Sequence, residues 1–381
     1  MIKKIYQIIR SFLAIIGLIV CTIIVFVISQ IQPYFSPQNS PVSSNNLVLT
    51  LDLKGKLLEK PKNSLFAIDG KNTSLLDLLK IIEQAQYDSR IKALVLKFHD
   101  PEIGFAQAEE LNKALLAFKS SKPIYTYTDT FGELSPANIS YFLASSSKQI
   151  WIQSGGFVGL TGIAIQTPFI KKALKKVGIE NHYLKRSEYK SAFDSTTEEK
   201  MNPLVKNMTT TLLNDLSNTL VKTIADNRKL EQTTVLAAIN NAPLTDQEAL
   251  ETKLIDSIGT LDEMHQAIRK QILANSAEFP LFIDSADYQL KFAKSSDKKP
   301  SIAIIYATGA IIRGDAEESL LSENNITASE NIVKACDQAI DDSKVKAIIL
   351  KIDSPGGSAI ASETIRQALL KAKRAGKPIV A

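Results

Sequence analysis

A long apolar run opens the chain. No charged residue occurs between Ser11 and Leu51, and residues 12–28 are almost entirely apolar. With its flanking residues the run reaches about 20 residues, which is enough to cross a hydrocarbon core of about 30 Å at about 1.5 Å per residue. A cleaved signal peptide or a buried core helix would be the alternatives, but Ser29-Gln30-Ile31 offers no small-residue cleavage pattern. The pattern therefore predicts one transmembrane helix over residues 11–31.

Charges at the start of the chain predict its orientation in the membrane. Lys3, Lys4 and Arg10 precede the apolar run, and positively charged flanks stay in the cytoplasm. We therefore expect residues 1–10 to be a cytoplasmic basic segment, with the body on the outer side of the membrane. Residues 32–46 are rich in Pro, Ser and Asn and have no apolar periodicity, which is typical of a linker.

Beyond the linker, wholly apolar strands alternate with amphipathic helices. A β-rich segment over 47–53 is followed by a helical pattern over 75–86, a strand over 93–96 and a second helical pattern over 106–119. Strands without polar alternation are buried on both faces, and strand–helix–strand order implies parallel pairing with right-handed crossovers. The pattern therefore predicts an α/β fold built on a parallel sheet.

The same order of elements recurs 254 residues later. Residues 88–98 align without a gap with residues 342–352, an agreement that predicts two tandem copies of one domain. The copies are expected over residues 47–290 and 300–381. The sequence stops as the next buried strand begins, which is an unusual place for a natural C-terminus. We therefore expect the second copy to be truncated after its first third, and this third to aggregate or be degraded unless a partner covers its strand edges.

Composition and charge exclude several classes of function. The chain has 45 Lys and Arg against 40 Asp and Glu, a net charge of +5 of which three charges lie in the first ten residues; the body therefore offers no strongly basic face for nucleic acid. Cys21 and Cys336 have no CxxC partner, and the three histidines form no HExxH motif. A disulfide framework and a cysteine-based zinc site are excluded. We expect no metal, no cofactor and no nucleic-acid partner.

Two local motifs could carry chemistry. Asp353-Ser354-Pro355-Gly356-Gly357-Ser358 follows a strand and precedes a helix, and adjacent glycines there let backbone N–H groups approach an anion, as an oxyanion hole requires. An ordinary strand-to-helix turn is the simpler interpretation. Lys190, within Glu188-Tyr189-Lys190-Ser191-Ala192, could act as a general base only if burial or nearby cations lowered its pKa. An exposed lysine is the simpler interpretation.

Other patterns favour structure over chemistry. We call residues 353–358 the glycine loop. In the first copy, the corresponding segment is His99-Asp100-Pro101-Glu102-Ile103-Gly104, which lacks the glycine pair. His99 and Asp100 are not expected to form a catalytic pair, because neighbouring residues on an extended chain point to opposite faces. Apolar residues at near-helical spacing over residues 203–227 predict a helix with a packed face, which could lie at a subunit contact; they are Leu204, Met208, Leu212, Leu216, Leu220 and Ile224.

These motifs together resemble the signal peptide peptidase A family, also called protease IV, in its long two-domain bacterial form. The resemblance rests on Tyr189-Lys190-Ser191-Ala192, on the glycine loop and on Ser362-Glu363 with Gly376-Lys377-Pro378, and it covers essentially the whole chain. It implies a crotonase-like, Clp-protease-like fold, homo-oligomeric assembly at the bacterial inner membrane, and cleavage of remnant signal peptides by a Ser–Lys dyad. Lys190 matches the general base, and Gly356 and Gly357 match the loop that lines the oxyanion site.

The nucleophile is the departure from the family pattern. The family serine lies several residues beyond the Lys-Pro-Ile-Val strand, where this sequence has ended, and Asn138 occupies the corresponding position of the first copy. Ser135 and Ser140 are out of register, and Ser354 and Ser358 are expected to be turn and helix-cap residues. The expectation is therefore a membrane-anchored serine endopeptidase whose nucleophile is absent from this chain. The alternative is a non-catalytic, membrane-tethered peptide-binding subunit or scaffold; an acyl-CoA-processing enzyme is disfavoured because it would not explain an outward-facing, anchored body.

Overall fold

The structure is a computed structural model that describes most of the chain after the linker. The described residues are Gly17, Thr22, 46–60, 74–133, 135–273, 280–285, 287–288, 300–316 and 326–381. The expected membrane helix and linker lie outside the described residues, apart from Gly17, Thr22 and Asn46. Within the described ranges, no helix has both the length and the apolar character needed to span a membrane.

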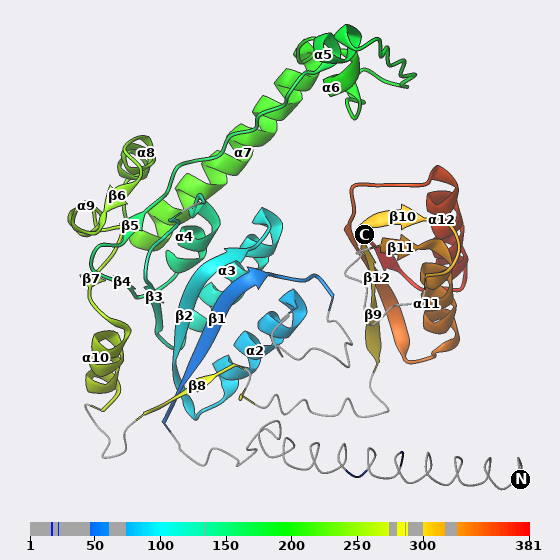
Figure 1. Ribbon diagram of the computed structural model, residues 1–381. Helices are drawn as coiled ribbons and strands as arrows, with labels where there is room; N and C mark the ends of the chain where they lie inside the picture. Colours follow the sequence, from blue (N-terminus) through cyan, green and yellow to red (C-terminus); the bar gives the residue numbers. More distant parts are fainter. Residues whose placement is uncertain are drawn as a thin grey trace, which may run out of the picture. The chain divides into compact units, whose positions relative to one another are not determined.

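A six-stranded sheet organises the first half of the described chain (Figure 1). All of its strand pairs are parallel, in the order β7-β4-β3-β2-β1-β8. The strands are β1 (Leu47–Lys56), β2 (Ile91–Glu102), β3 (Ile124–Thr128), β4 (Gln149–Ile152), β7 (Ser257–Ile258) and β8 (Leu281–Asp284). The α/β class with parallel strands is therefore confirmed.

Helices bury both faces of this sheet. The crossovers between β1, β2, β3 and β4 are α2 (Leu75–Tyr87), α3 (Phe105–Lys119) and α4 (Asn138–Ala144), and right-handed crossovers that advance in one direction place their helices on one face. The opposite face is covered by α10 (Leu261–Leu273), whose Met264 and Ile268 pack with side chains of β1, β2 and β3. Because both faces of the sheet are buried, its central strands are apolar on both sides and show no polar alternation.

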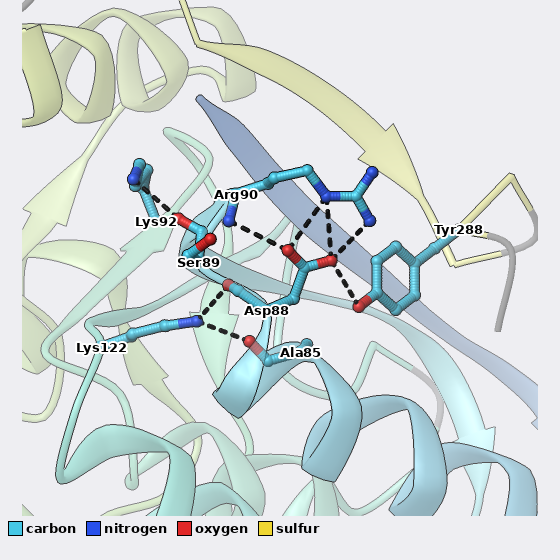
Figure 2. Close-up of polar contacts among 7 residues, drawn as sticks. All are labelled: Ala85, Asp88, Ser89, Arg90, Lys92, Lys122 and Tyr288. Atoms are coloured by element: carbon cyan, nitrogen blue, oxygen red, sulfur yellow. Dashed lines mark hydrogen bonds and ion pairs between the residues drawn. The ribbon is translucent and has the colours of Figure 1, made fainter. Parts of the chain in front are cut away.

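A residue just beyond β8, the last strand of the sheet, forms a hydrogen bond with the turn between α2 and β2 (Figure 2). The Tyr288 hydroxyl donates to Asp88 Oδ2 at 3.1 Å, and Arg90 donates to both oxygens of the same carboxylate. Lys122 donates its ammonium protons to the carbonyl oxygens of Ala85 and Asp88. The Arg90 hydrogen bonds outweigh the effect of partial burial and lower the pKa of Asp88 to about 2. This cluster fixes the segment after β8 against the sheet.

A long helix carries the middle of the chain away from the sheet. The helix α7 (Pro203–Arg228) has 26 residues, about 39 Å at about 1.5 Å per residue. Its C-terminal half packs near α4 and α8 (Gln232–Asn240) through Leu220 and Ile224, which are buried. At its other end Figure 1 shows α5 (Lys171–Lys176) and α6 (Asp194–Thr197).

The expected helix is confirmed, and its apolar face is packed within the chain only toward its C-terminal end; the expected subunit contact stays a prediction. Leu204, Met208 and Leu212 are exposed in the described chain, whereas Leu220 and Ile224 are buried. Helical spacing alone shows that one side of the helix is apolar. It does not show how much of that side finds a neighbour within the chain.

A second sheet occupies the end of the chain. Its strands β13 (Ile379–Val380), β12 (Val345–Asp353) and β9 (Ser301–Thr308) are parallel. Two helices connect them, α11 (Ser329–Asp341) and α12 (Ala359–Arg374). All eight residue pairs between β9 and β12 equal pairs between β1 and β2 with both numbers raised by 254, from Ser301–Val345 to Thr308–Asp353. The bulge after the first pair also recurs.

Short elements complete the described chain. They are the antiparallel pair β5 (Phe157–Val158) and β6 (Leu244–Thr245), the parallel pair β10 (Ala310–Ile312) and β11 (Ile326–Ala328), and helix α9 (Asp246–Glu251). The pattern of apolar residues did not predict these strands, because two or three residues are too few to show a period.

Candidate functional site

The glycine loop lies at the carboxyl end of β12 and leads into α12. Ser358 accepts a hydrogen bond from the Ala361 N–H at 3.2 Å, so its side chain caps the helix as expected. Ser354 Oγ accepts from the Gly356 N–H at 3.0 Å and stabilises the turn. Both serines therefore serve the backbone of the loop.

The Gly357 N–H is a backbone donor of this loop that is unused among the described residues. Its flanking groups are used, because the Gly356 carbonyl accepts from Ile311 N–H and the Ser358 N–H donates to the Ile311 carbonyl, each at 2.9 Å. The Gly357 N–H itself has no hydrogen-bond partner among the described residues. A Cβ at this position would collide with the Ile311 backbone, and Gly356 has a φ of 104°. Only glycine fits here, and the loop presents a backbone donor of the kind that stabilises an oxyanion.

Lys190 lies in the turn between α5 and α6, at the far end of α7. Its N–H donates to the Ser187 carbonyl at 3.3 Å, and its side chain is exposed. Within the described ranges, no hydrogen bond or ion pair links Lys190 to Gly356 or Gly357. The structure therefore places the two motifs on separate elements and does not bring them together.

The surroundings of Lys190 combine a half-buried ion pair with exposed apolar groups. Lys185 Nζ lies 2.8 Å from Asp194 Oδ1, and the Asp194 side chain is almost completely buried. The rings of Tyr183 and Phe193 contact each other with centroids 4.7 Å apart. Leu184 is fully exposed, and Phe193 is more than half exposed. The turn that carries Lys190 is thus held locally, and its apolar surface has no cover within the described chain.

Asn138, which the family resemblance places at the nucleophile position of the first copy, has a structural role in the fold. It is buried; its Nδ2 donates to the Gly162 carbonyl at 2.7 Å, and its Oδ1 accepts from the Gly162 N–H at 3.0 Å. Both ends of the amide are therefore used to fix the segment after β5. This contact joins residues 24 positions apart, and no local pattern in the sequence predicts it.

His99 is paired, but with a residue far away in the sequence. His99 Nδ1 and Asp52 Oδ1 lie 2.8 Å apart across β2 and β1, and Lys54 lies 3.2 Å from the other oxygen of Asp52. Burial raises the pKa of Asp52, but the hydrogen bonds from His99 and Lys54 outweigh it and leave the pKa lowered. Sequence reasoning missed this pair because it considered only the neighbour Asp100. No group of three potential metal ligands occurs in the part of the chain that the structure describes.

Comparisons with known proteins agree with the motifs. Residues 117–275 match the family model described as Peptidase family S49. The chain is 29% identical to Protease 4 of Salmonella typhi over 87% of its own length and 55% of the relative's. It is 28% identical to Protease 4 of Haemophilus influenzae, over 81% of this chain and 51% of that protein. It is 26% identical to the chloroplastic serine protease SPPA of Arabidopsis thaliana, over 88% and 48%.

The parallel sheets and the glycine loop first define a class, an α/β protein with a glycine turn at the carboxyl end of a parallel strand. The sequence matches, a Peptidase family S49 segment and similarity to proteins named Protease 4 and SPPA over most of the chain, then support an SppA-family protein. The chain spans about half the length of the curated relatives it matches. A solved structure, that of a mutant 1510-N membrane-bound stomatin-specific protease, covers 59% of this chain and 85% of its own at 14% identity, with a TM-score of 0.33.

Proposed function

We propose that this chain belongs to a membrane-anchored serine endopeptidase that degrades remnant signal peptides. The observation that carries the proposal is the Gly357 N–H, which has no partner among the described residues and is held by a turn that only glycine can adopt, in a chain that also has the family's Tyr-Lys-Ser-Ala motif. In the proposed reaction a serine Oγ bonds to the scissile carbonyl carbon while its proton passes to Lys190 Nζ. The carbonyl oxygen takes up the negative charge next to the Gly357 N–H, and the proton then goes to the leaving amine as the C–N bond breaks. Water next gives a proton to Lys190 Nζ and bonds to the carbon of the acyl ester, and the ester bond to the serine breaks as that proton returns to the serine Oγ.

The exposed position of Lys190 sets a condition for this chemistry. A lysine becomes a general base near neutral pH when burial lowers its pKa, and the apolar side chains around Lys190 are exposed. We infer that a second copy of the chain covers this surface, which would bury Lys190 and give the homo-oligomer expected from the family. Sedimentation of the Leu184→Asp variant tests this: dissociation supports it, and an unchanged oligomer contradicts it.

The proposal also includes the membrane anchor and the two-copy organisation. Residues 11–31 would span the inner membrane with the N-terminus in the cytoplasm, and protease added outside spheroplasts should then digest the body but spare residues 1–10. The identical register of the β1–β2 and β9–β12 pairs supports two copies of one domain, the second beginning near residue 300.

A peptide assay tests the proposed function. No serine of this sequence matches the family nucleophile, so the 381-residue chain is expected to bind a fluorescent signal peptide without cleaving it. Turnover that is lost in Lys190→Ala but kept in Lys200→Ala, an exposed lysine of the same segment, would show that a nucleophile lies within this chain. Binding without turnover in a longer chain that carries the family serine as well would favour the scaffold alternative, and absence of peptide binding would refute both functions.

A further inference from the structure

Positive charge is concentrated in one short segment in the middle of the chain. Residues 170–190 contain seven Lys and Arg against two Glu, a net charge of +5. The whole chain of 381 residues has the same net charge, so all its other residues together are neutral. The overall composition therefore conceals a strongly basic segment, and the expectation drawn from it missed this part of the surface.

The segment begins with the short helix α5, which lies at the N-terminal end of α7 (Figure 1). Its lysines are all exposed; they are Lys171, Lys172, Lys175 and Lys176. At about 100° per residue the four fall within an arc of about 140° around the helix. Lys172 Nζ lies 3.1 Å from Glu199 Oε2, whereas the other three lysines have no ion-pair partner among the described residues. One side of α5 is therefore a basic face open to solvent.

The opposite side of the same turn is apolar and also exposed. Ile170 and Val177, which flank α5, fall opposite the lysines at helical spacing, and they are 43% and 70% exposed. Ile179 follows them and is 49% exposed. The backbone here is held in place, because the Ile170 N–H donates to the Ser195 carbonyl at 2.8 Å and the Ile179 N–H donates to the Leu174 carbonyl at 3.0 Å. We call residues 170–179 the α5 patch.

The chemistry of the α5 patch favours a lipid surface over a protein interface. Lysine is depleted in the cores of protein interfaces, and burying an ammonium group without a partner is costly. A bilayer surface instead offers phosphate groups next to a region of hydrocarbon. A helix with lysines on one face and aliphatic side chains on the other can lie in the plane of that surface, because the lysine stems extend along the apolar zone while their charges stay with the headgroups.

We propose that the α5 patch binds the surface of a bilayer that contains anionic phospholipids. Its lysines attract the headgroup phosphates, and Ile170, Val177 and Ile179 enter the zone between headgroups and acyl chains. The surface differs from the one around Leu184 and Phe193, which the proposed function assigns to a second copy of the chain. The proposal does not depend on the peptidase reaction.

The test uses the 381-residue chain at one chain per lipid nanodisc. Val177→Trp adds an indole to the α5 patch, and lipids brominated on their acyl chains quench its fluorescence where it enters the bilayer. We expect quenching in discs that contain phosphatidylglycerol, much less in discs of phosphatidylcholine alone, and a loss of quenching in high salt, which screens the attraction. The parent chain, whose single tryptophan is Trp151 on β4, supplies the background signal.

Charge variants test whether the lysines supply the attraction. Lys175→Gln with Lys176→Gln should lower the equilibrium constant for docking of the patch about 25-fold, at about 5-fold for each lysine near an anionic surface. Lys206→Gln with Lys222→Gln, which removes two exposed lysines of α7, is the matched control and should dock as the parent does.

Hydrogen exchange keeps the test valid even if a variant misfolds. In the unaltered chain, the amides of residues 170–179 should exchange more slowly in discs with phosphatidylglycerol than in discs without it. Equal quenching in both lipids, equal docking of the two double variants, or protection that requires two chains per disc would each overturn the proposal. Binding of a single-stranded oligonucleotide to residues 170–179 in preference to the lipid would overturn it as well.

Discussion

Arg228 joins the long helix α7 to the sheet, and its removal should destabilise the first half of the chain. Its guanidinium donates to both oxygens of Asp256 at 2.9 Å and to the Lys253 carbonyl at 2.8 Å, and its side chain is 6% exposed. Asp256 Oδ2 also accepts from the Ile150 N–H of β4 at 2.7 Å. Arg228→Met keeps the apolar stem but leaves this carboxylate without its cation.

The size of the effect follows from the burial of the two partners. Breaking a fully buried ion pair costs about 3–5 kcal/mol, but the Asp256 side chain is 31% exposed and keeps part of its hydration. We therefore expect the free energy of unfolding to fall by about 2–3 kcal/mol. Arg228→Met combined with Asp256→Asn should cost less than the single Arg228 change, since no uncompensated charge is left behind.

Urea unfolding followed by tryptophan fluorescence measures this change. The single tryptophan of the chain, Trp151, lies on β4 next to Ile150, and at about 3 kcal/mol per M the midpoint should fall by about 1 M. Lys222→Met is the matched control, because Lys222 and Asp226 form an exposed pair on the same helix at 3.6 Å; its cost should be about 0.3–0.5 kcal/mol. Equal midpoints for Arg228→Met and Lys222→Met would refute the reasoning.

Two further predictions concern groups of the same half. Tyr141→Phe should lower the free energy of unfolding by about 1–2 kcal/mol in the urea assay, because the buried hydroxyl donates to the Leu254 carbonyl at 2.6 Å and that acceptor would lose its donor; no change in midpoint would contradict this. The Arg90 hydrogen bonds lower the folded pKa of Asp88 to about 2, so its stabilising effect should be complete above about pH 4 and be lost as the pH falls toward 2. Asp88→Asn should flatten the dependence of the urea midpoint on pH in that window, and an unchanged slope would contradict the assignment.

The sequence predicted the helices with a clear apolar period and the strands with a continuous apolar run. Apolar runs such as residues 93–96 and 347–350 became central parallel strands, and the expected helix over 75–86 is α2, one residue longer. Contacts between distant residues were beyond it: nothing near His99 points to Asp52, and nothing near Asn138 points to Gly162. Such pairs depend on which strands become neighbours, and neighbours are set by the three-dimensional fold.

Burial shows a deeper limit of the pattern. Val48 and Ile302 occupy the same place in matching strand pairs, and both are β-branched residues that suit a covered sheet. One is fully buried and the other is 60% exposed, because α10 packs over this face of the first sheet and β8 pairs with its edge strand β1, whereas no described residues cover the same face of the second. An apolar strand therefore predicts that both faces of its sheet favour burial. It does not predict whether another element of the chain packs over them. The same argument applies to α7 and to the turn of Lys190, which also expose apolar side chains. In the proposed function, association with another chain would cover these side chains and complete the site.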